Sequence, residues 1–312
     1  MSSSDNLIQE LKAIRDGVAL YDASHYGQVT IQGPEAASFL HKVTSNDVQK
    51  LSIGEGHYNA ILDRKGMVLS LFYLYHGGES EFVAVLPHQL TEKTSVFLTK
   101  MRFIQKVTIK DLSTERGLLL FIGPEAEPIA RKAASGGGGR FLWKEELFGS
   151  PVWNFSAPKE TTSQLRGELS ATIPIVQENS FRLLKMSAGF PEYGIDIDET
   201  HILLELKTPV AYQRQKGCYP GQEVIERILA YGKGRTPRAL STLFIEGEHS
   251  VTAGTEVVSP SGEKAGVVTS ALYHPLDQKT VVLAYVDQKY VDHVSSLRLT
   301  LHPPMPTSPP IS

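Results

Sequence analysis

KGCYPGQE, residues 216–223, is the most distinctive stretch of this 312-residue chain, and it contains Cys218, the sole cysteine. One thiol forms no intrachain disulfide and does not complete a zinc or iron–sulfur site, each of which needs several soft ligands. Free cysteine often only packs in a core. Two glycines, a lysine, a glutamine and a glutamate make a poor core segment, whereas glycines let a loop approach a ligand closely. We therefore predict a functional loop, with Cys218 as a nucleophile or as a ligand shared with another molecule.

The composition of the whole chain is that of an ordinary globular protein with two or three packed units, 41% hydrophobic and 21% charged. A net charge of −3 gives no general attraction to nucleic acid or to an anionic membrane. The single cysteine argues against a disulfide-built secreted fold. The polar N-terminus lacks the apolar core of a signal peptide, and no apolar run approaches the roughly 20 residues that span a bilayer. We expect a cytoplasmic protein.

Apolar periodicity and turn residues predict an α+β chain before residue 237. The predicted helices are one that Gly17 ends, one that residues 33–35 open, and those at 91–101, 126–134 and 175–186. The predicted strands are 28–31, 67–75, 81–86, 106–111 and 117–122.

The sequence after Pro237 has a different texture. Short alternating runs at 239–245, 255–258, 265–270 and 280–286 are separated by turn residues, which is typical of a small β-barrel. We predict two interleaved α+β subdomains over residues 1–236 and a barrel domain over 237–302. Residues 303–312 contain five prolines and are expected to form a disordered tail.

Basic residues gather around the octapeptide, opposed only by Glu223 and Glu226. They are Arg214, Lys216, Arg227, Lys233, Arg235 and Arg238. This surplus favours a loop for a carboxylate-rich or phosphate-bearing partner, although charge runs are usually just solvated surface. RNA binding is a weaker alternative, because only Tyr219 and Tyr231 offer aromatic rings for base stacking there.

No base for a cysteine hydrolase is evident, because the ten histidines are scattered and none lies in the octapeptide. His25, His41 and His57 are too widely spaced to predict a metal site. We interpret each as a surface or capping residue and predict no metal site.

The octapeptide followed by Arg227 resembles the Lys-Gly-Cys-Tyr-x-Gly-Gln-Glu signature of the folate-binding YgfZ family, relatives of the aminomethyltransferase (T-protein) of the glycine cleavage system. The resemblance runs from about residue 11 to 301. The segments similar to the wider T-protein superfamily are 18–27, 33–40, 44–48, 188–194, 266–270 and 284–286. It implies a multi-domain T-protein-like folate-binding fold with a small C-terminal β-barrel.

Three positions depart from the T-protein pattern. A T-protein usually carries paired aspartates where this chain has Ser70 and Leu71, and a glutamate where it has Ser187. Neither serine nor leucine supplies a bidentate carboxylate. The departures therefore disfavour aminomethyl transfer, while the family scaffold still implies tetrahydrofolate binding in a central cavity.

The resemblance implies a tetrahydrofolate-binding accessory protein for the assembly or repair of iron–sulfur clusters in client enzymes, including tRNA-modifying methylthiotransferases. The alternative is a tetrahydrofolate-dependent aminomethyl or one-carbon transferase. Cys218, as the thiol, and Lys216 are the expected catalytic residues. The expected cofactor-binding residues are Lys216, Gly217, Tyr219, Gly221, Gln222, Glu223 and Arg227. Expected partners are folate and iron–sulfur client enzymes or assembly proteins, with no membrane, no direct nucleic acid and no permanently bound metal.

Overall fold

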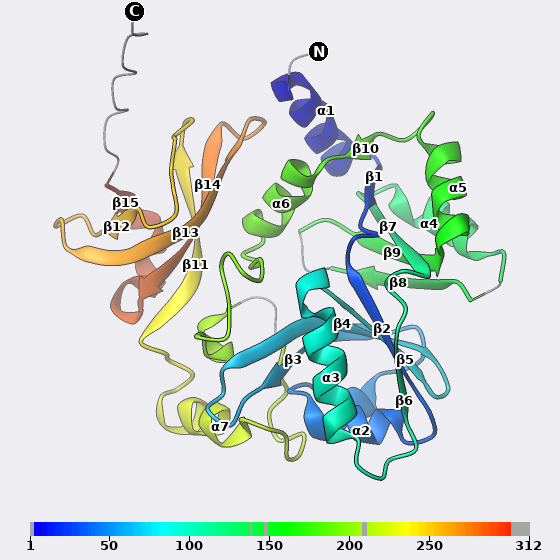
Figure 1. The fold of residues 1–312 in the computed structure, drawn as a ribbon. Helices are drawn as coiled ribbons and strands as arrows, with labels where there is room; N and C mark the ends of the chain where they lie inside the picture. Colours follow the sequence, from blue (N-terminus) through cyan, green and yellow to red (C-terminus); the bar gives the residue numbers. More distant parts are fainter. Residues whose placement is uncertain (1–2, 138, 147–148, 208–210, 301–312) are drawn as a thin grey trace, which may run out of the picture.

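The computed structural model describes residues 3–137, 139–146, 149–207 and 211–300. The predicted tail at 303–312 lies outside the described residues. The described chain folds into three five-stranded sheets with helices packed against them (Figure 1). The predicted α+β class is confirmed.

The first sheet is antiparallel and follows the order β3-β4-β5-β2-β6. Its strands are β2 (Gly27–Gln32), β3 (Gly56–Leu62), β4 (Val68–Gly78), β5 (Glu81–Leu86) and β6 (Thr108–Asp111). Two helices belong to this part of the chain, α2 (Ala36–Val43) and α3 (Thr91–Met101). The residues that α2 buries are Ala36, Phe39, Leu40 and Val43, whose spacing puts them on one helical face.

The second sheet has the order β10-β1-β7-β9-β8. Its strands are β1 (Ala19–Asp22), β7 (Arg116–Ile122), β8 (Phe141–Glu145), β9 (Val152–Pro158) and β10 (Ile175–Val176). The associated helices are α1 (Ser3–Asp16), α4 (Ala126–Ala134), α5 (Lys159–Leu169) and α6 (Glu178–Ser187). Every residue of β7 is buried, because this central strand is covered on both faces.

Two predictions in this region are corrected. The helix expected from residue 175 begins at Glu178, because residues 175–176 instead pair with β1 in parallel as β10. The sequence did not predict α5, whose polar face is wide and which buries only Thr162 fully. A helix with so few buried apolar residues gives a weak periodic signal.

The third sheet is C-terminal, curled, and ordered β11-β14-β13-β12-β15 (Figure 1). Its strands are β11 (Arg238–Glu246), β12 (Glu256–Val258), β13 (Lys264–His274), β14 (Lys279–Asp287) and β15 (Arg298–Leu299). The four predicted strands are confirmed as β11 to β14. Among the described strands no pairing joins β15 to β11, so the expected barrel takes the form of a curled sheet.

The octapeptide is a loop only as far as Gly221, which corrects the prediction of a loop throughout. Its last two residues open helix α7 (Gln222–Tyr231). Gly221 precedes the helix with φ +81°, and a Cβ atom there would lie 2.5 Å from the carbonyl oxygen of Asp63 in the β3–β4 turn. The glycine is therefore required both by backbone conformation and by close packing against that turn.

Candidate functional site

A cavity of about 350 Å³ lies between the two N-terminal sheets and α6. Strands β3, β4, β5, β7, β8 and β9 contribute side chains to its wall, together with α6 and the segment 190–193. Segments far apart in sequence therefore meet around one partly open cavity. Such a cavity, mostly apolar with a few polar groups, is the usual form of a small-molecule site.

Aromatic rings form one wall of the cavity. Tyr58 packs edge-on against Tyr73, with ring centroids 5.1 Å apart, and against Phe190 at 4.8 Å. Phe181 of α6 lines the cavity as well. Rings held in this way offer faces and edges to a flat ligand.

Glu145, at the end of β8, is a buried carboxyl group in the cavity wall, 7% exposed. The hydroxyl of Tyr58 and the indole N–H of Trp143 each donate to it at 3.4 Å. Burial raises the pKa of Glu145 to about 7, although these hydrogen bonds act in the opposite direction. Its charge therefore changes near neutral pH.

Two further glutamates line the cavity and already have partners. Glu178, the first residue of α6, accepts a hydrogen bond from the hydroxyl of Tyr21. Glu192 lies 3.0 Å from the guanidinium Nε of Arg182. Both carboxylates are thus compensated without a ligand.

Lys185 is the cation in the cavity wall, and its side chain is buried. Its ammonium donates to the hydroxyl of Tyr26 at 3.3 Å and lies 5.1 Å from the centre of the Phe181 ring. Within the described ranges it has no carboxylate at ion-pair distance. A buried ammonium with so little compensation favours a ligand that brings a hydrogen-bond acceptor or a negative charge.

The positions that differ from the T-protein pattern have distinct surroundings. Leu71 lines the cavity, whereas the hydroxyl of Ser70 contacts that of Thr94 at 2.8 Å. Ser187 is the last residue of α6 and is not among the residues that line the cavity. The sequence pattern showed that the T-protein acids are replaced at these positions. It did not predict that three glutamates line the cavity, because they lie in other segments of the chain. The one sequence signal for a cavity carboxyl group was Glu145, which ends the mostly apolar strand at 141–145.

The octapeptide lies outside the cavity wall. Residues 217–220 line an open depression together with His41 and Lys42 of α2. Cys218 is exposed there. Glu223 and Arg227 are exposed on α7, and Gln222 is half-buried. The octapeptide is thus separate from the cavity, and its role as a functional site stays a prediction.

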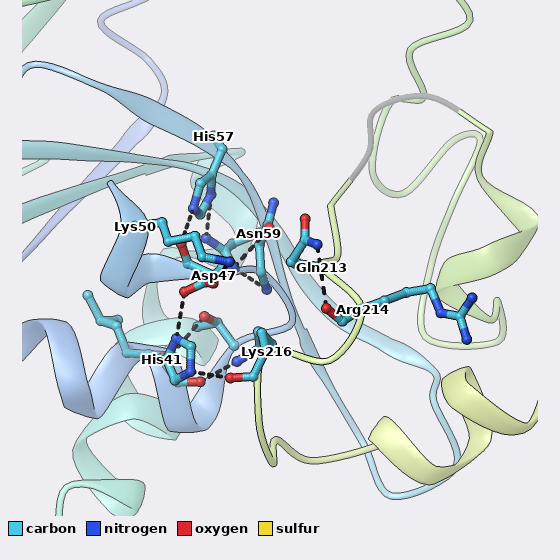
Figure 2. Close-up of polar contacts among 11 residues, drawn as sticks. His41, Asp47, Lys50, His57, Asn59, Gln213, Arg214 and Lys216 are labelled. Carbon is cyan, nitrogen blue, oxygen red and sulfur yellow. Dashed lines mark hydrogen bonds and ion pairs between the residues drawn. The ribbon is translucent and has the colours of Figure 1, made fainter. Parts of the chain in front are cut away.

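His41, which lines the depression, binds Lys216 (Figure 2). The ring Nε2 of His41 lies 2.5 Å from the carbonyl oxygen of Lys216, and the ammonium of Lys216 donates to the carbonyl oxygen of His41. Since a carbonyl only accepts, Nε2 carries the hydrogen. The other ring nitrogen, Nδ1, lies 3.2 Å from Oδ1 of Asp47, and Lys50 lies 2.9 Å from Oδ2 of that carboxylate.

Lys216 is buried beside the exposed thiol, with its ammonium 4.8 Å from the centre of the Tyr219 ring. Burial lowers the pKa of Lys216 to about 8, against the attraction of Asp47 and Cys218. The interpretation of His41 as a mere surface or capping residue is wrong. It lies 175 positions from Lys216 in sequence, so only the fold brings it beside Cys218.

The basic patch predicted around the octapeptide has fewer exposed, unpaired cations than the sequence indicates. Arg214 pairs with Glu226 at 3.5 Å and extends away from the His41 cluster (Figure 2). Arg238 pairs with Glu205 at 3.2 Å. With Lys216 buried, the exposed cations that continue the patch are Arg227, Lys233 and Arg235.

Neither a membrane helix nor a metal cluster is seen in the part of the chain that the structure describes. Over those residues, no helix combines the length and apolarity needed to cross a bilayer. Across the same ranges, no three His, Cys, Asp or Glu side chains group as metal ligands would.

Known proteins resemble this chain in sequence along most of its length. Residues 1–138 match the family described as the GCVT N-terminal domain. An aminomethyltransferase from Thermus thermophilus is 27% identical over 309 residues, covering 91% of this chain and 83% of that protein. An aminomethyltransferase from Listeria innocua is 33% identical over 123 residues, covering 39% of this chain and 34% of that protein.

The fold has a close solved counterpart. The crystal structure of glycine cleavage system aminomethyltransferase T from Bartonella henselae matches with a TM-score of 0.79 and 20% identity, covering 91% of this chain and 82% of that one. The fold is therefore the T-protein fold, as predicted. The chain is thus similar to aminomethyltransferases in sequence and shares the fold of one. The narrower YgfZ resemblance stays a prediction.

Proposed function

We propose that this chain binds tetrahydrofolate in its central cavity and acts through Cys218 in the assembly or repair of iron–sulfur clusters in client enzymes. The observation that carries the proposal is the separation of two sites. A cavity lined by aromatic rings suits a small flat molecule, while the thiol stands exposed in a more open depression where another protein can reach it. The octapeptide's resemblance to the YgfZ signature supports the iron–sulfur role.

The polar groups of the cavity suit the pterin ring of a folate. Glu145 would accept hydrogen bonds from the amino and ring N–H groups, as a carboxylate pairs with adjacent donors. Lys185 would donate to an acceptor on the same ring or to a carboxylate of the folate tail. The wall of Tyr58, Tyr73 and Phe190 would contact the ring itself.

Calorimetry with tetrahydrofolate tests cofactor and site together. We expect wild type and Lys216→Ala to bind alike, and Lys185→Met to bind about tenfold more weakly, since one charge-assisted hydrogen bond is worth roughly 1.5–3 kcal/mol. Loss of binding in Lys216→Ala with normal binding in Lys185→Met would move the folate site to the octapeptide. No heat with any variant would remove the folate proposal.

The thiol role is tested separately. Cys218→Ser should bind tetrahydrofolate as wild type does but should fail to restore the activity of an iron–sulfur methylthiotransferase in cells from which the gene for this chain is deleted. The control is Thr300→Ser, a mild change at the far end of the described chain. Full restoration by Cys218→Ser would end the thiol role and leave folate binding untouched.

A tetrahydrofolate-dependent one-carbon transferase is the second candidate, and two observations favour it. The Thermus thermophilus relative that covers 91% of the chain is an aminomethyltransferase. Glu145 also keeps an acid in the cavity despite Ser70, Leu71 and Ser187, and its pKa of about 7 suits proton transfer at neutral pH. Turnover of an aminomethyl donor with tetrahydrofolate, abolished by Glu145→Gln, would support it. Absence of turnover across a donor panel would rule it out.

A further inference from the structure

We infer that His41 and Asp47 are positioning residues for Cys218, holding the backbone on which the thiol stands. The inference rests on the proposed role of Cys218 as the reactive thiol. It assigns a purpose to a cluster that lies apart from the cavity, on α2 and the segment after it (Figure 2).

The backbone before Cys218 has two residues with positive φ, and contacts with other segments stabilise this conformation. Gln215 has φ +58° and Gly217 has φ +113°, both outside the range that most residues prefer. The peptide between Lys216 and Gly217 carries the carbonyl that receives the His41 ring. One bond from α2 therefore fixes a peptide that lies one residue before the thiol-bearing residue.

The ring of His41 is itself oriented. Its Nδ1 lies 3.2 Å from Oδ1 of Asp47, at ion-pair distance, while Nε2 of the same ring donates to the Lys216 carbonyl. Asp47 is held in turn, because Lys50 contacts its other oxygen and the ring Nε2 of His57 lies 3.3 Å from its backbone carbonyl. The carboxylate thus fixes the direction in which the ring points at the loop.

The cations near Cys218 mean that the position of the loop affects the reactivity of the thiol. The buried ammonium of Lys216 interacts with Cys218, and Lys42 lines the same depression. Asp47 and Lys50 are the other charged groups of the cluster. Because a nearby cation favours the thiolate, the reactivity of Cys218 depends on the loop being held with the thiol close to Lys216.

Alkylation of Cys218 by iodoacetamide tests the inference, because a single cysteine makes the rate unambiguous. We expect His41→Ala to react about tenfold more slowly than wild type at about pH 7, because its loop no longer holds the thiol close to Lys216. His41→Gln should recover most of the rate, since its side-chain amide can still donate to the Lys216 carbonyl. His249→Gln is the matched control, because the ring of His249 also contacts a backbone carbonyl, that of Glu246, in the C-terminal sheet.

Lys216→Met gives a second measurement, because it removes the ammonium but keeps the backbone carbonyl that receives the His41 ring. It should remove the component of the rate profile that titrates near the pKa of Lys216, about 8. An unchanged alkylation rate in His41→Ala, or a His41→Gln variant as slow as His41→Ala, would overturn the inference. Either result is independent of the client-enzyme assay with Cys218→Ser, so this inference and the proposed function can fail separately.

Discussion

His41 and Lys216 each bond the backbone carbonyl of the other, across 175 positions of sequence. The contact joins α2 of the first sheet to the loop that carries Cys218 (Figure 2). It explains why Lys216 is buried although most lysines are exposed. A lysine whose stem packs on Tyr219 and whose ammonium caps a helix carbonyl serves the fold as well as the site.

Lys216→Met should change the pH dependence of stability in alkaline solution. The pKa of Lys216 is lowered to about 8 in the folded protein, whereas an unfolded lysine titrates at its ordinary value of 10.5. Between these values the unfolded chain binds more protons, so this lysine makes stability rise with pH. Denaturant unfolding from about pH 7 to 11 should show this rise in wild type and in the exposed-lysine control Lys264→Met, and a reduced rise in Lys216→Met. Identical curves would contradict the lowered pKa.

Glu145→Gln should stabilise the ligand-free protein at neutral pH. Folding raises the pKa of Glu145 from 4.5 to about 7, so the folded state binds more protons in that interval and stability falls as pH rises through it. The full penalty, reached above about pH 7, is about 3 kcal/mol by linkage. Denaturant unfolding at about pH 4 and pH 8 should show the gain only at the higher pH. An equal gain at both would mean that charge is not the cause.

Gly221→Ala should destabilise the protein more than Gly54→Ala does. Both glycines have positive φ, +81° and +89°, so each alanine costs about 1–2 kcal/mol in strain. A Cβ on Gly54 meets nothing within 4 Å, whereas one on Gly221 would lie 2.5 Å from the Asp63 carbonyl oxygen. The difference in the free energy of unfolding isolates the close approach of the octapeptide to the β3–β4 turn. An equal loss of unfolding free energy in the two variants would show that the β3–β4 turn moves to accommodate the Cβ atom at little cost.

Asp196→Ala should weaken the attachment of the C-terminal sheet. The buried carboxylate accepts hydrogen bonds from Ser270 at 2.7 Å and from Thr269, at the irregularity in β13, and from the backbone N–H of Glu192 at 2.9 Å. Losing these charge-assisted bonds should cost about 3 kcal/mol or more. Asp196→Asn retains an oxygen for the hydroxyl groups and should cost less. A loss in Asp196→Asn as large as in Asp196→Ala would instead point to the charge.

Local sequence signals predicted most of the regular structure. The helices at 91–101 and 126–134 have the predicted bounds, and β11 to β14 follow the predicted alternating runs closely. Apolar periodicity, turns and glycines act within a few residues, so one chain suffices to find them. Helix α5 was missed because its apolar periodicity is weak, and two further errors occur where contacts with other segments decide the structure. Residues 175–176 became a strand because β1 lay beside them, and Gln222 opened a helix because Gly221 could pack on the β3–β4 turn.

The octapeptide and the single thiol were readable from sequence, because a motif keeps its residues contiguous. The surroundings of Cys218 were not, since His41 and Asp47 lie far from it along the chain and reach it only when α2 packs beside the loop. The same holds for the cavity, where Glu145, Glu178 and Lys185 come from a strand and a helix that meet only in the folded protein. Sequence alone thus determined that this protein carries a single thiol within a distinctive motif. Tertiary structure decided what surrounds it and where a ligand can enter, because burial and charge depend on distances that only packing sets.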